Sequence, residues 1–260
     1  LRAAGREVGL HGNDRDRRGG AALDDDRRDL ERRAGAAVRG VRFHYLRCLY
    51  HETLPLLDAA GLAYDTSLAF AEHEGFRCGT SLPFHPYCLA EDRPLALLEV
   101  PLALMDTSLQ GTQYRALGAA EAERVAREIL ARLTAGAGGA SLLWHNVRFD
   151  RRTAQGYDDV YWRLVDWVQA NRGLATSAGD LAARWRAATG EDAPTAASGE
   201  EATDAVAETA AIRPPLPSRA ATRVLHLSVV HKPDDPRISE RECRTLADAG
   251  YDVTYLVPGA

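Results

Sequence analysis

The stretch "ASLLWHN" (residues 140–146) ends a short apolar run with a histidine and an asparagine. The segment before it, "AAEAERVAREILARL" (residues 119–133), repeats apolar residues at helical spacing, and so does "DVYWRLVDWVQANR" (residues 159–172) after it. A buried strand between two amphipathic helices is typical of α/β proteins, whose helices cover a parallel sheet. These segments therefore predict an α/β fold in which a strand delivers polar side chains at its end.

Strand-like and helix-like patterns alternate over most of the chain. Runs typical of strands cover residues 7–11, 38–46, 62–68 and 95–103, and helical patterns cover residues 23–37, 52–61 and 174–188. Such alternation predicts a parallel β/α architecture.

The composition changes after residue 187. Residues 188–221 are rich in Ala, Thr, Glu and Pro and poor in large apolar residues, which is typical of a disordered linker. Residues 222–260 then contain a single βαβ pattern, which cannot form a core of its own. We therefore predict three parts: a first domain at residues 1–187, a disordered linker at 188–221, and the opening of a truncated second domain at 222–260.

Charge and length exclude several classes of protein. The 260 residues are 45% hydrophobic, which is enough to bury a core. A formal net charge of −5 gives no reason to expect nucleic acid as a partner. No apolar run approaches the ~20 residues that span a bilayer. The 4 cysteines form no CxxC pair, so we expect reduced thiols.

Polar residues gather at the predicted strand ends. His11 ends the first strand pattern, and Arg42 and His44 lie on the second. Asp65 ends the third, and His145 ends the run "SLLWH". The carboxyl ends of parallel strands meet on one face of a β/α barrel. One such histidine is often an ordinary hydrogen-bonded residue, but histidines at three strand ends indicate a site.

Segments spread over the first domain carry a family resemblance. In chain order they are "EVGLHGN", "GVRFHYLR", "AGLAYDTSLAFAEHEGFRCGTSLPFHPY", "LLEVPLALMDTSL" and "LLWHNVRFD". Together they resemble the polysaccharide deacetylases of carbohydrate esterase family 4, in particular a divergent bacterial branch with an Arg-any-His-Tyr motif. The resemblance extends from Glu7 to about Arg186. It implies a distorted (β/α) barrel, a divalent metal, usually zinc, and hydrolysis of N-acetyl or O-acetyl groups on a glycan.

The resemblance also implies roles for individual residues. His11 matches a metal-binding histidine, His145 matches the histidine that serves as the acid, and Arg42 matches the arginine that orients the base. Tyr45 would line the groove or position the oxyanion. Amide hydrolysis of this kind needs an activated water, a carboxylate that takes its proton, and an acid that protonates the departing amine.

Three further residues are expected to contact the substrate. Asp65, Arg77 and Asp106 lie in segments that look like loops bordering the cleft. Ordinary roles, as turn aspartates or as a solvated arginine, are the open alternatives.

One departure from the family pattern concerns the metal. The family places a second metal-binding histidine four residues after the first, where this chain has Arg15, which stays protonated and cannot bind a metal. His44 stands where the ordinary motif has proline, and we expect its imidazole to replace the missing ligand. A role as a hydrogen-bonding residue in the wall of the site is the alternative.

A second departure concerns the catalytic base. The family's Thr-Phe-Asp-Asp motif, which supplies the base and one metal ligand, has no counterpart in this sequence. We expect that strand and its aspartate pair to lie upstream of Leu1. We therefore expect little or no deacetylase turnover from these 260 residues.

The final segment resembles a different family. "RVLHLSVVHKPDDPRISERECRTLADAGYDVTYLVPG" resembles the first βαβ unit of GT-B glycosyltransferases of the family 4 type. Its turn, with Arg237, follows a strand and precedes a helix, where a Rossmann-like unit meets its ligands. The resemblance implies the start of a transferase domain whose nucleotide-sugar site lies in the other half of that fold.

Both resemblances together predict a bacterial metal-dependent deacetylase in surface polysaccharide biosynthesis. Its partner would be an acetylated glycan or sugar, and it would work in the cytoplasm, where it would associate peripherally with the membrane machinery of polysaccharide assembly. Two other interpretations stay open. One is a non-catalytic carbohydrate-binding or scaffold module, and the other is a barrel-type metal amidohydrolase, which would carry a His-any-His pair on its first strand.

Overall fold

The computed structural model describes residues 7–17, 19–136, 138–150, 152–191, 223–227 and 252–256. The chain divides into two units, Leu1–Pro194 and Thr195–Ala260. All of the predicted site residues belong to the first unit.

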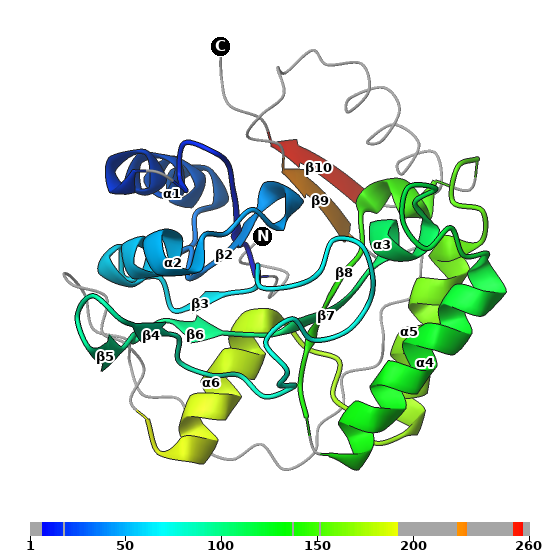
Figure 1. Ribbon diagram of the computed structural model, residues 1–260. Helices are drawn as coiled ribbons and strands as arrows, with labels where there is room; N and C mark the ends of the chain where they lie inside the picture. Colours follow the sequence, from blue (N-terminus) through cyan, green and yellow to red (C-terminus); the bar gives the residue numbers. More distant parts are fainter. Residues whose placement is uncertain are drawn as a thin grey trace, which may run out of the picture. The chain divides into compact units, whose positions relative to one another are not determined.

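Strands and helices alternate along the first unit (Figure 1). The strands are β1 (Leu10–Gly12), β2 (Gly40–Phe43), β3 (Tyr64–Asp65), β4 (Tyr87–Cys88), β5 (Arg93–Pro94), β6 (Leu98–Glu99), β7 (Leu102–Met105) and β8 (Ser141–Leu143). The helices are α1 (Gly20–Ala34), α2 (Tyr50–Ala59), α3 (Asp106–Gln110), α4 (Ala119–Ala135), α5 (Tyr157–Ala170) and α6 (Ala178–Thr189), with 3-10 turns η2 (His44–Leu46) and η3 (Asn146–Phe149). The predicted α/β class is confirmed.

Six of these strands form two parallel groups, and β4 and β5 form a separate antiparallel pair. β1, β2, β3 and β6 make a four-stranded sheet in that order, and His11 stands opposite Arg42 in its register. β7 pairs in parallel with β8. Val100 and Pro101 alone separate β6 from β7, so the chain passes directly from one group to the other. The parallel arrangement is as predicted. The closed barrel stays a prediction, because strand pairing among the described residues leaves the two groups separate.

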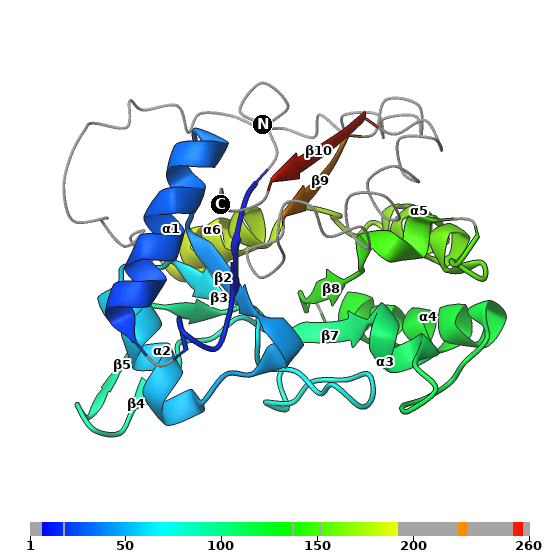
Figure 2. The same ribbon diagram turned by 90° about the horizontal axis from the view of Figure 1, so that it is seen from above.

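Helices α4 and α5 lie side by side next to the β7–β8 pair (Figures 1 and 2). The buried residues of α4 recur at spacings of three and four, which is the pattern that made this helix predictable: Ala122, Val125, Ala126, Ile129, Leu130 and Leu133. They share one core with Leu104 of β7 and Leu164 of α5. Burial of each large aliphatic side chain contributes about 1.5–3 kcal/mol, so this core holds β7 and β8 in place.

Helix α6 packs against the four-stranded sheet. Its Ala182 and Trp185 pack with Tyr64 of β3 and Leu98 of β6. Arg186, which is buried, donates hydrogen bonds to the carbonyl groups of residues 63 and 96, at 3.0 Å and 2.8 Å. These bonds satisfy carbonyl groups beside β3 and β6, so the helix is tied to the sheet by polar contacts as well as by packing.

Two glycines let aromatic rings approach the strands. A Cβ atom on Gly40 would lie 2.0 Å from the ring of Tyr64, and one on Gly12 would lie 2.7 Å from the ring of Phe43. Both distances are shorter than any van der Waals contact. Gly12 follows His11 directly, so the Phe43 ring occupies the space beside the first predicted site residue.

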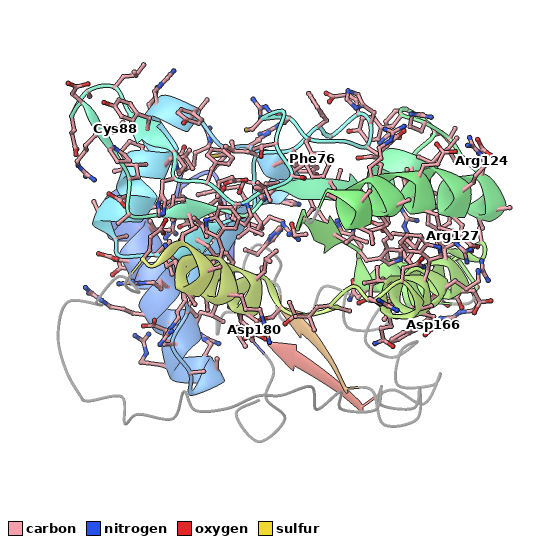
Figure 3. The ribbon with its side chains drawn as sticks, turned by 90° about the horizontal axis from the view of Figure 1, so that it is seen from below. Phe76, Cys88, Arg124, Arg127, Asp166 and Asp180 are labelled. Atoms are coloured by element: carbon pink, nitrogen blue, oxygen red, sulfur yellow. The ribbon has the colours of Figure 1, made fainter. Side chains whose placement is uncertain are left out.

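Charged side chains cover the exposed sides of the helices. Figure 3 shows Arg124 and Arg127 on α4 and Asp166 on the neighbouring α5. Glu123 of α4 pairs both with Arg127, at 2.6 Å, and with Arg163 of α5, at 2.6 Å. Exposed ion pairs of this kind contribute at most about 1 kcal/mol each, so packing carries most of the stability. None of the helices that the structure describes combines the length and the hydropathy of a membrane span.

The second unit contains one described pair of strands. β9 (Arg223–Leu227) pairs in parallel with β10 (Asp252–Leu256). The helix predicted between them and the linker before them lie outside the described residues, as does Cys243. Of the other cysteines, Cys48 and Cys88 are buried free thiols and Cys78 is an exposed one. The domain boundaries stay predictions.

Candidate active site

Two histidines meet at the carboxyl ends of β1 and β2. His11 lies on β1, and His44 opens the 3-10 turn that follows β2. Their ring centroids lie 5.1 Å apart, with the ring planes inclined by 62°. Parallel pairing of the two strands brings their ends to the same edge of the sheet, which is why residues 33 positions apart in the chain come together.

Burial keeps His11 in its neutral form. Loss of solvent, and after it the nearby charges of His44, Arg42 and His145, together lower its pKa to about 4, against a hydrogen bond to the backbone of Arg42 that raises it. The imidazole is therefore uncharged at neutral pH. That form can offer a nitrogen lone pair to a metal ion or to a proton.

Arg42 joins the two groups of strands. Its Nε donates to Oγ1 of Thr66 at 2.8 Å, and its Nη2 donates to Oγ of Ser141, on β8, at 3.2 Å. Burial lowers its pKa, and the carboxylate of Asp65 acts in the opposite direction. Guanidinium groups stay protonated even so, which places a fixed positive charge beneath the imidazoles.

Tyr45 is an exposed ring on a strained turn. Tyr45 and Leu46 have φ angles of 57° and 55°, a left-handed conformation that residues other than glycine rarely adopt. The ring is 70% exposed and stacks on His44, with centroids 4.1 Å apart. The guanidinium carbon of Arg47 lies 5.4 Å from the same centroid. This turn therefore holds an aromatic surface at the rim of the histidine pair.

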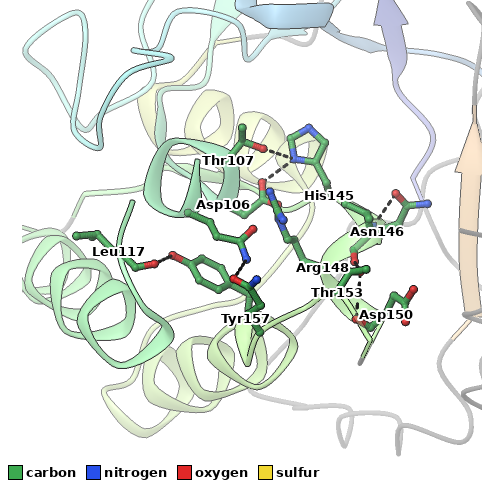
Figure 4. A network of polar contacts seen from close by, with 12 residues as sticks. Asp106, Thr107, Leu117, His145, Asn146, Arg148, Asp150, Thr153 and Tyr157 are labelled. Atoms are coloured by element: carbon green, nitrogen blue, oxygen red, sulfur yellow. Dashed lines mark hydrogen bonds and ion pairs between the residues drawn. The ribbon is translucent and has the colours of Figure 1, made fainter. Parts of the chain in front are cut away.

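His145 is held by a buried carboxylate on α3. Nδ1 of His145 lies 2.6 Å from Oδ1 of Asp106, and Nε of Arg148 donates to Oδ2 of the same aspartate at 2.8 Å (Figure 4). Asp106 is fully buried, whereas the His145 side chain is 44% exposed. A carboxylate that receives an arginine hydrogen bond is ionised and can only accept. Nδ1 therefore carries the proton, and Nε2 is the free nitrogen.

The substrate contact of Asp106 stays a prediction, and the structure shows other partners for this carboxylate. It has no exposed surface, and both of its oxygens are occupied. The hydroxyl of Thr107 also lies 3.3 Å from Nδ1 of His145. The aspartate supports a neighbouring side chain instead of facing the solvent, because β7 ends just before it and turns its side chain inward.

Asp65 also lies away from the solvent. Its Oδ1 accepts a hydrogen bond from the hydroxyl of Ser67 at 2.7 Å, and it shares a hydrogen bond with Glu99, which is equally buried. Burial first, and then the charge of Asp65, raise the pKa of Glu99 well above its ordinary range. Glu99 therefore stays protonated and donates to Asp65. The substrate contact at Asp65 stays a prediction, and the structure shows this buried pair instead of an exposed carboxylate.

Arg77 is the last of the predicted residues. It is exposed on the long connection between β3 and β4. Among the residues that the structure describes, no hydrogen bond or ion pair joins it to the histidines. The structure thus brings His11, His44, Arg42, His145 and Tyr45 towards one region, and it leaves Arg77 on the surface.

Sequence reasoning missed Arg148 and Glu99. Arg148 follows His145 by three residues, a spacing that one helical turn brings to the same side, and this signal was present in "HNVR". Glu99 stands inside the apolar run "LALLEVPLA", and a charged residue in such a run is itself a sign of a buried polar contact.

The donors for a metal are incomplete in the described part of the chain. His11 and His44 provide two imidazoles, but no group of three or more His, Cys, Asp or Glu side chains arranged to hold a metal ion occurs among the described residues. Catalytic zinc sites use three protein ligands. The histidine pair therefore provides only two of the three ligands that such a site needs.

Comparisons with known proteins point to one fold. No model of a known protein family matches the chain. No curated protein matches it either. Among solved structures, the chain is similar to a crystal structure from Mycobacterium smegmatis that is provisionally described as a polysaccharide deacetylase, with a TM-score of 0.52 and 20% identity over 77% of this chain and 69% of that chain. At this identity the likeness concerns the fold alone, so the chain has a fold similar to that of this deacetylase-type protein.

Proposed function

We propose that residues 1–187 form a metal-dependent deacetylase, a hydrolase of C–N bonds that removes N-acetyl or O-acetyl groups from a sugar. One observation carries the proposal. His145, with Asp106 behind it, lies close enough to His11 to lower the pKa of His11 electrostatically, at the strand ends of a fold similar to that of a deacetylase-type protein.

His145 is the residue best placed to act as the acid. Asp106 keeps a proton on Nδ1, so Nε2 is the nitrogen that can carry a second proton to the departing amine. The exposed ring of Tyr45 offers a face on which a sugar can stack. Arg42 would fix the strand ends around the site, since its hydrogen bonds reach both groups of strands.

A divalent metal, zinc in this proposal, would supply an activated water and polarise the carbonyl group of the substrate. His11 and His44 are the residues that would hold it, because zinc binds the neutral imidazole that burial favours at His11. The third ligand is not among the described residues. We therefore expect zinc affinity weaker than that of a three-ligand site.

A non-catalytic carbohydrate-binding module is the second candidate. One observation favours it: the carboxylates at the ends of β3 and β7, Asp65 and Asp106, are both fully buried and already bonded. Neither can take a proton from water. A chain without a base would bind an acetylated glycan and release little acetate.

Two measurements separate the candidates. A tetramer of N-acetylglucosamine is added with zinc, binding is followed by the ring signals of the histidines, and released acetate is quantified. For a deacetylase we expect binding together with slow acetate release that His145→Gln abolishes, while His73→Gln, on an exposed histidine, leaves it unchanged. Binding without any release that depends on His145 favours the binding module. Absence of binding and of release contradicts both.

The metal proposal has its own test. Zinc content per chain is measured after dialysis for the wild type, His44→Ala and the control His51→Ala. We expect a loss of bound zinc in His44→Ala alone. Undiminished zinc in that variant would show that His44 is a residue of the wall and not a ligand.

The second unit and the setting remain part of the proposal. We infer that residues 222–260 open a GT-B glycosyltransferase domain, which the parallel pairing of β9 and β10 supports. Deacetylation next to sugar transfer would suit bacterial surface polysaccharide assembly in the cytoplasm, with peripheral association to the membrane machinery. Transfer from a nucleotide sugar by a longer chain that includes both halves would test this part.

A further inference from the structure

Arg148 is the one cation that contacts the buried carboxylate behind His145 among the described residues. Its Nε lies 2.8 Å from Oδ2 of Asp106, and its side chain is 18% exposed. The two oxygens of Asp106 are divided between two partners, since Oδ1 faces Nδ1 of His145 and Oδ2 faces Arg148 (Figure 4). Arg148 itself does not contact Nε2, the nitrogen available for chemistry.

The charge of Arg148 has a specific consequence for His145. A fully buried carboxylate with a single imidazole partner would favour the imidazolium form, because the ion pair offsets the loss of solvent. A fixed guanidinium on the other oxygen already balances the carboxylate. The imidazole can then stay neutral with its proton on Nδ1, while Asp106 stays ionised.

Other charged or titratable groups face this pair from neighbouring elements. His11 of β1 interacts electrostatically with His145. Tyr157 of α5 interacts with both Arg148 and Asp106, and burial raises its pKa to about 12, so its hydroxyl stays neutral. Neither group can replace the positive charge that Arg148 provides.

We propose that Arg148 is a positioning residue, which keeps Asp106 ionised and thereby holds His145 as the neutral Nδ1–H tautomer with Nε2 free. As a statement about catalysis this rests on the proposed function. The tautomer of His145 can be measured without any enzymatic activity. The positioning role of Arg148 and the proposed deacetylase function can therefore fail separately.

The test follows the imidazole of His145 directly. Protein labelled with ¹⁵N-histidine is prepared as wild type, Arg148→Lys, Arg148→Gln and the control Arg152→Gln, and the ring signals of His145 are assigned with His145→Gln. Lysine keeps the charge, whereas glutamine keeps a donor and removes the charge. Arg152 lies in the same loop, is 70% exposed and pairs with Asp150, so it matches Arg148 in type and position but not in contact.

We expect wild type, Arg148→Lys and Arg152→Gln to show a protonated Nδ1 and an unprotonated Nε2 at neutral pH. In Arg148→Gln, we expect Nε2 of His145 to be protonated as well, because the buried carboxylate then has the imidazole as its one cationic partner. Thermal melts confirm that each variant is folded. If Arg148→Gln does not fold, Arg148→Lys alone tests the proposal. A changed tautomer of His145 in folded Arg148→Lys would contradict a role of Arg148 through its charge.

Identical ring signals and proton uptake in wild type and Arg148→Gln would overturn the proposal. Equal shifts in Arg148→Gln and Arg152→Gln would also overturn it, because they would reflect a general change of the loop. If acetate release is observed, its alkaline limb should move in Arg148→Gln in the same direction as the ring signals, because His145 must carry the proton that the departing amine receives. A shifted ring titration without any acetate release would support the positioning role and count against the deacetylase.

Discussion

The two sides of the candidate site are held in different ways. On one side, a buried aspartate and an arginine fix His145 through short hydrogen bonds. On the other side, His11 and His44 are placed by strand pairing and by contact between rings. Hydrogen bonds specify the tautomer and orientation of a ring, whereas packing specifies only its position. The ring of His145 is therefore fixed by side-chain partners, whereas His11 is positioned by strand pairing, ring contact and a hydrogen bond to the backbone of Arg42.

The two sides of the site also differ in charge. Asp106 is compensated by a cation, so its burial is tolerated. His11 has no such partner and is kept neutral by burial. Asp106 thus keeps its charge inside the protein because Arg148 pairs with it, whereas His11 loses its charge because it is buried.

Among the variants that test this difference, Asp106→Asn should cause the largest loss of stability. An amide cannot accept from both His145 and Arg148 as the carboxylate does, and the guanidinium is left largely buried beside a neutral group. We expect a loss of about 3–5 kcal/mol in the free energy of unfolding, measured in urea. Asp14→Asn, at a carboxylate with 58% exposure that pairs with Arg47, should cost less than about 1 kcal/mol. Equal losses in both variants would contradict the distinction between the two kinds of pair.

Gly40→Ala tests the side that depends on packing. The new methyl group would overlap the ring of Tyr64, so either that ring or β2 must shift, and a shift of β2 would carry His44 with it. We expect a loss of about 2–3 kcal/mol in unfolding free energy and altered ring signals of His44. Gly20→Ala, where a Cβ meets nothing within 4 Å, is the matched control and should be neutral or slightly stabilising. Unchanged His44 signals in Gly40→Ala would mean that β2 does not set the position of this ring.

Glu99→Gln should change how stability depends on pH. The folded protein keeps a proton on Glu99 that the unfolded chain releases above its ordinary pKa of 4.5. Stability should therefore fall as pH rises from there towards the raised pKa, by at most about 1.4 kcal/mol for each pH unit. Glutamine keeps a donor for Asp65 without binding a proton, so we expect a flatter profile between about pH 5 and pH 8. A slope equal to that of the wild type would show that Glu99 is ionised in the folded state.

Tyr45→Asn should have the smallest effect. Asparagine tolerates the left-handed backbone, and relief of strain should offset the loss of the exposed ring, so we expect a change of less than about 1 kcal/mol in unfolding free energy. The His44 ring loses its stacking partner, and its signals should broaden. Gln155→Asn, at another left-handed position, should relieve strain without affecting His44. A loss above about 2 kcal/mol would show that the tyrosine ring contributes to the core instead.

Much of the fold was predictable because its signals are local. The helix α4 was expected from its apolar spacing, and β1, β2, β3 and β8 were expected from short apolar runs. The ends of these strands carry the predicted histidines and arginine: His11 stands opposite Arg42 in one sheet, and His145 follows β8. Closure of the strands into a barrel depends on pairing between distant segments, and no local pattern records that pairing.

The buried aspartates show where prediction from sequence stopped. A carboxylate just after a strand pattern has the same appearance in sequence whether it faces a cleft or a neighbouring side chain. Asp65 and Asp106 were both expected to contact a substrate. In the structure Asp65 accepts from Ser67, two residues on, and interacts with Glu99 of β6, and Asp106 contacts His145. The side to which a strand end turns is decided by what packs against it, and those partners lie about 30–40 residues away in the chain, Glu99 for Asp65 and His145 for Asp106.

The sequence by itself determined the alternation of strands and helices and the gathering of histidines at strand ends, because periodicity and strand polarity are properties of short segments. Tertiary structure alone decided that Asp106 and Arg148 stand behind His145 and that Asp65 shares a proton with Glu99. Protonation and tautomer depend on burial and on charges from distant parts of the chain, and these exist only once the chain has folded.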